Sequence, residues 1–204
     1  MTEEERKELE SVLDDTRLKI SAEGGRIVEK KGWFWVALHY IVMVVTFGGN
    51  RDFLKGYYTT IGPWIGVPEG WEKRSLAGRI AVLEHECTHI RQCKKFGFGN
   101  AIVGLPLYTM LYLLLPLPIG LAYFRWRFER EAYAWGINAR ISIEPYMRAH
   151  LIDSAVVQLT SGKYGWTWPF PERVRRYFEE HVEHHVSPEQ ARRAAAGIIE
   201  RDVQ

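Results

Sequence analysis

The stretch HECTH, residues 85–89, places two imidazoles and one carboxylate within five consecutive positions of the chain. It lies inside residues 76–96, LAGRIAVLEHECTHIRQCKKF, where apolar residues recur at helical spacing and no proline interrupts. We therefore predict a helix, which Gly97 would end as a C-terminal cap. On a helix, His85 and His89 lie one turn apart on the same face, so both rings can reach one metal ion.

Zinc suits such a site, because it accepts nitrogen and oxygen ligands in a tetrahedron at about 2.0–2.2 Å. Glu86 would then lie beside the open position of the ion, where a water molecule binds. A carboxylate in that place can take a proton from the water once zinc has lowered its pKa toward about 7. The motif therefore indicates zinc as the cofactor and Glu86 as a proton acceptor.

Two histidines leave a zinc site incomplete, and residues 127–134, RFEREAYA, offer a further ligand. We expect this segment to be a second helix that carries Glu129 opposite a small residue. Ala132 leaves room for the two helices to approach closely, which a ligand from a separate helix requires. Glu131 and Glu144 are alternative ligands. Glu131 lies about 200° around the helix from Glu129, so these two carboxylates cannot both face the metal.

The pairing of H-E-x-x-H with a downstream E-x-x-A resembles the gluzincin-type zinc metallopeptidases, especially their compact members. The likeness covers residues 57–138. It implies that His85, His89 and Glu129 bind zinc. It also implies that Glu86 is the general base that activates water for hydrolysis of a peptide bond. A peptide or protein substrate is the partner that follows from this resemblance.

One position departs from the family pattern. Many members carry an Asp directly after the E-x-x-A, which hydrogen-bonds a ligand histidine, whereas this chain has Tyr133. The second N–H of a metal-binding histidine usually goes to a carboxylate, a carbonyl or water. A phenol or a backbone carbonyl would then hold the histidine here. Alternatively, Tyr133 points at the site and supports the transition state as a catalytic residue, and both roles stay open.

Residues 57–62 and 64–68 are expected to form β-structure ahead of the motif helix, broken at Gly62-Pro63. In the family that the chain resembles, a strand in this place forms the rim of the cleft and pairs with an extended peptide. Such pairing gives affinity through main-chain hydrogen bonds. An ordinary sheet strand without a role in substrate binding is the alternative.

The 204 residues fit a single domain, residues 1–204, with an α+β, zincin-like fold. We expect a small β-sheet packed on the motif helix and a mostly helical C-terminal half. An N-terminal helix over 1–22, a helix over 137–159 and C-terminal helices over 170–204 complete this fold. Residues 33–47, WFWVALHYIVMVVTF, favour a central strand covered on both faces, with a buried helix as the competing interpretation. The candidate buried positions in the helix over 137–159 are Ile141, Ile152, Val156 and Leu159.

Residues 101–124 contain no charged residue, a length that suits a membrane span. A single crossing, however, would separate Glu129 from His89 by a layer about 30 Å thick. We therefore predict an apolar hairpin insertion over 101–126, with pieces at 101–115 and 117–126 that Pro106 and the prolines at 116 and 118 interrupt. Burial in the core, contact with a membrane surface and contact with a protein partner are the three alternatives for residues 101–124.

Composition narrows the class of protein. A formal net charge of +2 gives no electrostatic case for a nucleic-acid partner. Cys87 and Cys93 are six residues apart on one predicted helix, so we expect buried thiols rather than a disulfide. The N-terminal sequence MTEEERKELE is too highly charged for a secretory signal. These features favour a cytoplasmic protein, with membrane association as the open alternative.

The leading prediction is a zinc-dependent metallopeptidase with His85, His89 and Glu129 as ligands and Glu86 as the general base. The alternative is a metal-stabilised binding or assembly protein that keeps the motif without turnover. Tyr133 and the apolar segment over 101–124 motivate this alternative prediction. The two differ in whether loss of the Glu86 carboxylate removes the function.

Overall fold

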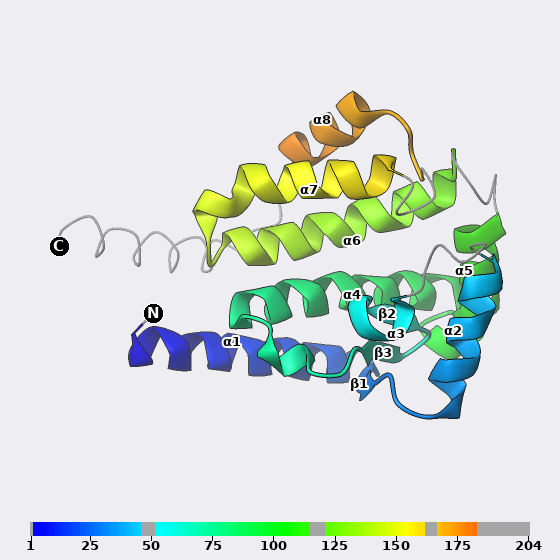
Figure 1. Cartoon of the computed structure of the whole chain (residues 1–204), viewed down its shortest axis with the longest axis horizontal. Helices are drawn as coiled ribbons and strands as arrows, with labels where there is room; N and C mark the ends of the chain where they lie inside the picture. The colour runs from blue at the N-terminus through cyan, green and yellow to red at the C-terminus, as the bar shows by residue number, and fades with distance from the viewer. Residues whose placement is uncertain (1, 46–51, 115–120, 162–166, 183–204) are drawn as a thin grey trace.

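The computed structural model describes residues 2–45, 52–114, 121–161 and 167–182. Within them the chain forms eight α-helices and one three-stranded sheet, an α+β arrangement in which helices dominate (Figure 1). The small sheet, the motif helix and the mostly helical C-terminal half therefore agree with the α+β part of the predicted fold class. The further C-terminal helix predicted beyond residue 182 lies outside the described residues.

Helix α1, Glu3–Ala22, begins where the sequence predicts an N-terminal helix. The Thr2 hydroxyl accepts a hydrogen bond from the Glu5 amide, and the Glu5 carboxylate accepts one from the Thr2 amide. This reciprocal capping satisfies two amide groups that the first turn leaves without helical partners. Leu13 and Ile20 of α1 are buried in the core that surrounds the motif helix.

The sheet joins β1, Arg26–Glu29, with β2, Thr59–Ile61, and β3, Trp64–Val67. Its order is β1-β3-β2, with β1 parallel and β2 antiparallel to β3. The two strands predicted ahead of the motif helix are confirmed, and Gly62 in the turn between them has a left-handed φ of 56°. Strand β1 was not predicted, because four residues with no alternating burial leave little pattern in a sequence. The order leaves β2 at one edge of the sheet.

Helix α4, Leu76–Phe96, is the predicted motif helix and lies at the centre of the fold. The Ser75 hydroxyl caps its first turn by accepting from the Gly78 amide, and the helix ends at Gly97. It contacts α1, α5, α6 and β2. Cys87 and Cys93 are buried and free, as expected for reduced thiols on one helix.

The predicted hairpin is only partly correct. Helix α5, Ala101–Leu114, matches the first predicted piece, but it continues through Pro106 instead of breaking there. Proline removes one helical hydrogen bond, and here both Pro106 and the residue four positions earlier, Ile102, lie on the exposed side of the helix. The second piece is not a separate arm, because its last residues already belong to α6, Tyr123–Ile141. The predicted reversal at residues 116–118 lies outside the described residues.

The prediction of a central strand over 33–47 is wrong. These residues form α2, Trp33–Val45, which leads toward the short α3, Phe53–Gly56. Trp35 is buried against the sheet, where a Cβ on Gly66 would overlap its indole ring. Among the α2 side chains whose burial the structure describes, Trp33, Tyr40 and Ile41 are clearly exposed. The competing prediction of a buried helix is therefore correct for the helix and wrong for the burial of these residues.

The helix predicted over 137–159 is divided. Helix α6 ends at Ile141, a short 3-10 turn η2 covers Pro145–Met147, and α7 runs over Arg148–Thr160. Pro145 cannot continue an α-helix, because it lacks the amide donor. Helix α8, Pro171–His181, packs on α7. The predicted buried positions Ile141, Ile152, Val156 and Leu159 are all buried.

The core has two parts on either side of α6. One part gathers α1, the sheet, α4 and α5, and the other gathers α6, α7 and α8. Figure 1 shows α4, α6 and α7 running side by side, with α1 beyond α4. Among the described residues no single helix is long and apolar enough to cross a membrane, and one bent pair, α4 with α5, meets that test jointly.

Candidate metal centre

Close packing of α4 against α6 brings the motif helix to the second ligand-bearing helix. A Cβ on Gly136 would lie 2.9 Å from the carbonyl oxygen of Ala81 and 3.3 Å from Cβ of His85. Ala132, one turn earlier on α6, is fully buried. These small residues let the two backbones approach each other, as the sequence predicts for Ala132.

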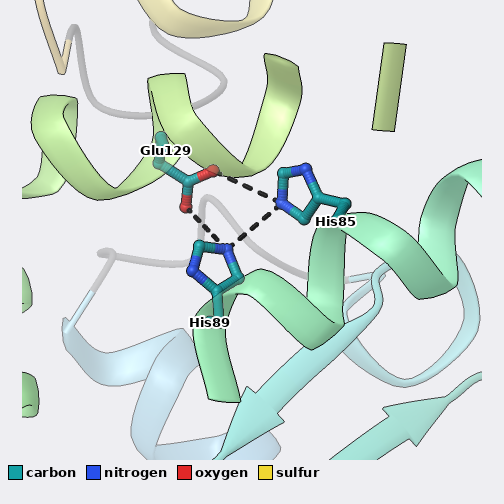
Figure 2. Close-up of side chains that lie close together, drawn as sticks. All are labelled: His85, His89 and Glu129. Atoms are coloured by element: carbon teal, nitrogen blue, oxygen red, sulfur yellow. Dashed lines mark hydrogen bonds and ion pairs between the residues drawn. The ribbon is translucent and has the colours of Figure 1, made fainter. Parts of the chain in front are cut away.

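The side chains of His85, His89 and Glu129 meet between these helices. Their ligand atoms all lie within 4.8 Å of one another. The two Nε2 atoms are 3.2 Å apart, and the Glu129 oxygens lie 3.5 Å from His85 Nε2 and 3.8 Å from His89 Nε2. Figure 2 shows both rings on α4 and the carboxylate on α6 turned toward one another. This group can hold a metal ion.

The surroundings of the Glu129 carboxylate favour a bound cation over a site made of protein groups alone. Its side chain is 1% exposed, and Oε2 has no hydrogen-bond partner among the described residues. Burying a carboxylate without a partner costs several kcal/mol. A positive ion between Oε2 and the two imidazoles would supply the missing partner.

The imidazole of His85 is held in its neutral form. Burial lowers the pKa of His85 well below its usual value, and the neighbouring His89 lowers it further. A hydrogen bond to the backbone of Ala132 acts in the opposite direction, as expected for a ring N–H that donates to a carbonyl. A neutral imidazole keeps a lone pair for a metal. Of the partners considered for this histidine, the backbone carbonyl is therefore the one present.

A chain of hydrogen bonds fixes the ring of His89. Its Nδ1 lies 2.9 Å from Oε1 of Gln92 and 3.0 Å from the Tyr108 hydroxyl. The Gln92 amide donates to the Phe128 carbonyl at 2.9 Å and to Glu131 at 3.0 Å. These two bonds identify Oε1 of Gln92 as the acceptor, so Nδ1 of His89 carries the proton. Nε2 of His89 then has its lone pair free for a metal.

Helix α5 supplies two tyrosines that the sequence analysis did not select. Tyr108 and Tyr112 lie one turn apart on its inner face, and Tyr112 donates a hydrogen bond to Oε1 of Glu129. Burial raises the pKa of both phenols well above the usual value, so both hydroxyls keep their protons. The spacing at i and i+4 in an otherwise apolar helix was the available signal.

Glu86 lies beside the cluster, on the side of the sheet. Its side chain is buried, and Oε2 accepts a hydrogen bond of 2.7 Å from the Thr60 hydroxyl of β2. Burial raises the pKa of Glu86, while His89 and the Thr60 bond lower it by smaller amounts. Edge strand β2 is thus tied to the residue predicted to act as the general base.

Lys30 is a second buried group that the sequence analysis missed. Its ammonium donates to the carbonyls of Phe53 and Tyr57 at 3.0 and 2.8 Å and to the Thr59 hydroxyl at 2.8 Å. Burial lowers the pKa of Lys30 to about 8, although the charge of Glu86 raises it somewhat. Lys30 therefore anchors β1 to the segment that leads into β2.

The remaining predicted residues lie as follows. The Tyr133 ring packs edge-on against the His85 imidazole, with centroids 4.8 Å apart and planes at 87°. The alternative ligands do not join the cluster, because Glu131 accepts from Gln92 and Glu144 pairs with Arg140 at 2.6 Å.

Comparison of the chain with protein-family models, with curated proteins and with solved structures gives no match. The residues of the cluster and their geometry are therefore the basis for proposing a function.

Proposed function

We propose that this protein is a zinc-dependent metallopeptidase of zincin-like architecture, with His85, His89 and Glu129 as zinc ligands. The observation that supports this proposal is the buried Glu129 carboxylate, whose Oε2 has no hydrogen-bond partner among the described residues and lies 3.5 Å from Nε2 of His85, while Oε1 lies 3.8 Å from Nε2 of His89. Two imidazoles and one carboxylate are a ligand set typical of catalytic zinc, which keeps a fourth position open. Calcium and magnesium prefer sites made of oxygen ligands, so they fit this set less well.

Glu86 has the surroundings that a general base of this reaction needs. When bound, zinc would polarise a substrate carbonyl and lower the pKa of a water molecule. The Glu86 carboxylate takes a proton from the attacking water and then gives it to the amine that leaves as the peptide bond breaks. Burial raises the pKa of Glu86, which makes its carboxylate a stronger proton acceptor, and Thr60 holds its side chain in place.

Strand β2 is the element that supports an extended peptide as substrate. It lies at the edge of the sheet, and its Thr60 contacts Glu86. An edge strand presents unpaired backbone groups, with which a peptide can pair as an additional strand. A peptide paired with β2 would have its backbone close to the general base.

The test compares wild type with Glu86→Gln. We expect both proteins to contain about one zinc per chain by elemental analysis, because Glu86 is not a ligand. Hydrolysis of a mixed peptide library, followed by mass spectrometry, should fall by roughly 10²–10⁴-fold in the variant. Glu84→Gln is the matched control, since Glu84 lies on the same helix but pairs with Lys19 at 2.6 Å. Wild type purified without zinc, or a fully active Glu86→Gln, would contradict the proposal.

A metal-stabilised assembly protein is the second candidate. Tyr133, which packs against His85 where the resembled family carries an Asp, favours it. In that case Glu86→Gln would keep zinc and thermal stability, and wild type would hydrolyse no peptide in the library. His85→Ala would still lower the melting temperature, because it removes a ligand.

A further inference from the structure

Two helices that lack charged residues lie at the same end of the molecule. Helices α2 and α5 contain no Asp, Glu, Lys or Arg over 13 and 14 residues. Both lie at the right-hand end of Figure 1, where α2 runs across the direction of α1. Helix α5 meets α4 at 98°, so it also runs across the long helices.

Each of the two helices buries one face against the rest of the molecule and exposes the opposite face. Trp35 of α2 and Tyr108 of α5 are buried against the sheet and the metal cluster. The outer faces expose large apolar side chains at 43–82% of their surface, among them Trp33, Tyr40, Ile41, Ile102, Val103 and Leu107. Large apolar side chains that are exposed together on a surface often mark an interaction site.

Several basic residues lie beside these two helices in the chain or on the helices that they contact. Lys31 precedes α2, Lys55 ends α3, Lys95 ends α4, and Arg125 and Arg127 lie in the first turns of α6. Lys31 and Lys95 have acidic partners, Glu29 and Glu131. Arg125 donates to the Tyr112 carbonyl at 3.2 Å and lies over the Tyr112 ring. Lys55 and Arg127 are exposed and have no carboxylate partner within salt-bridge distance among the described residues.

We propose that α2 and α5 together form a docking face for the surface of an anionic phospholipid bilayer. A charge-free apolar face with exposed Trp and Tyr suits the boundary between headgroups and acyl chains. The exposed Lys55 and Arg127, which have no carboxylate partner among the described residues, complement anionic headgroups, and each such residue adds to the attraction. The exposed basic residues beside the apolar face favour an anionic lipid surface as the occupant over an apolar protein surface.

The geometry favours helices that lie in the membrane surface rather than cross it. At about 1.5 Å per residue, each helix is roughly 20 Å long, shorter than the hydrocarbon layer of about 30 Å. Because both helices run across the long helices, their outer faces can enter one leaflet while α1, α4 and α6 point away from it. The inner face of α5, with Tyr108 and Tyr112, would then place the metal cluster close beneath the membrane surface.

The experiment is flotation of the full chain with vesicles on a density gradient. Vesicles are made either of phosphatidylcholine alone or of an equal mixture of phosphatidylcholine and phosphatidylserine. We expect wild type to float with the mixed vesicles and more weakly with the neutral ones. Trp33→Glu and Val103→Glu should each lower the bound fraction by roughly tenfold or more, because each replaces an exposed apolar group that would enter the bilayer with a charge.

Tyr146→Glu is the matched control, because Tyr146 is 77% exposed on η2, which follows the other end of α6. It should float as wild type does. The proposal of a docking face is contradicted if wild type floats with neither kind of vesicle, or if Trp33→Glu and Val103→Glu float as well as wild type. It is equally overturned if wild type forms a dimer that these substitutions dissociate, without binding vesicles. Circular dichroism checks that every variant is folded, and no result depends on peptide hydrolysis.

Discussion

The hydroxyl of Tyr112 donates a hydrogen bond to the carboxylate of Glu129, which links α5 to the side chain that completes the metal cluster. The bond occupies Oε1 and leaves Oε2 directed at His85. Tyr112 therefore decides which oxygen of Glu129 is available to an ion. Such partners of a ligand fix its orientation and often matter nearly as much as the ligand itself.

Tyr112→Phe should weaken zinc binding without removing it. The substitution keeps the ring and deletes the hydroxyl, so the Glu129 carboxylate can rotate. We expect the zinc Kd to rise by roughly 10-fold to 100-fold, measured by competition with a chromogenic chelator. Tyr123→Phe is the control, since Tyr123 is half exposed at the start of α6. An unchanged Kd in Tyr112→Phe would show that the bond does not orient the ligand.

Gln92→Leu should affect both metal binding and folding. The side chain of Gln92 accepts from His89 and donates to Phe128 and Glu131 from a fully buried position. Leucine leaves these groups without partners, so the free energy of unfolding of the metal-free protein should fall by about 1–3 kcal/mol. Urea denaturation measures that loss.

The same variant should raise the zinc Kd by roughly tenfold or more, because the His89 tautomer is no longer fixed. Gln158→Leu on α7 is the control for replacing an amide with an apolar group, as Gln158 is only partly buried. Equal effects in the two variants would contradict a specific role for Gln92.

Gly136→Ala tests the close approach of α4 and α6. The added Cβ would lie 2.9 Å from the Ala81 carbonyl oxygen, which belongs to the rigid backbone of α4. Separation of the helices should cost about 1–3 kcal/mol of unfolding free energy and weaken zinc binding, because Glu129 moves with α6. Gly56→Ala is the control, with the nearest atom 3.5 Å from its Cβ. A Gly136→Ala variant as stable as wild type would show that α4 and α6 accommodate the added methyl group without loss of stability.

Lys30 should make the stability of the metal-free protein depend on pH in the alkaline range. Burial lowers its pKa to about 8 in the folded chain from the usual lysine value of 10.5. Between these values the unfolded chain binds the extra proton, so stability rises as the pH rises through this window. We expect a gain of about 2 kcal/mol once solvent screening is allowed for. Lys30→Met should lack this rise in urea denaturation, and an identical pH profile would refute the assignment.

The motif helix was predictable because its signals are local. The Ser75 cap, the apolar spacing and Gly97 all lie within or beside residues 76–96. The proximity of Glu129 was inferred from a small residue, Ala132, and the structure shows that Gly136 also lies at this close approach of the two helices. The ends of a helix and the positions of its small side chains can both be recognised from residues that are close together in the sequence.

Other features depended on tertiary contacts that no local pattern contains. The apolar run at 33–47 has no decisive period, so nothing in it separated a strand from the observed helix α2. Gln92 and Tyr112 act on the cluster through partners that are distant in the chain, namely Phe128, Glu131 and Glu129. Their roles follow only once α4, α5 and α6 are placed together.

The two faces of helix α5 have different roles. Its inner face carries Tyr108 and Tyr112 toward the metal cluster, and its outer face exposes apolar side chains. Because a helix turns by about 100° per residue, an insertion or deletion between Asn100 and Tyr112 would swing every later side chain to a new direction. The tyrosine hydroxyls would leave the ligands, and the apolar face would rotate with them. We expect this short segment to accept many exchanges of residue but no change in its length.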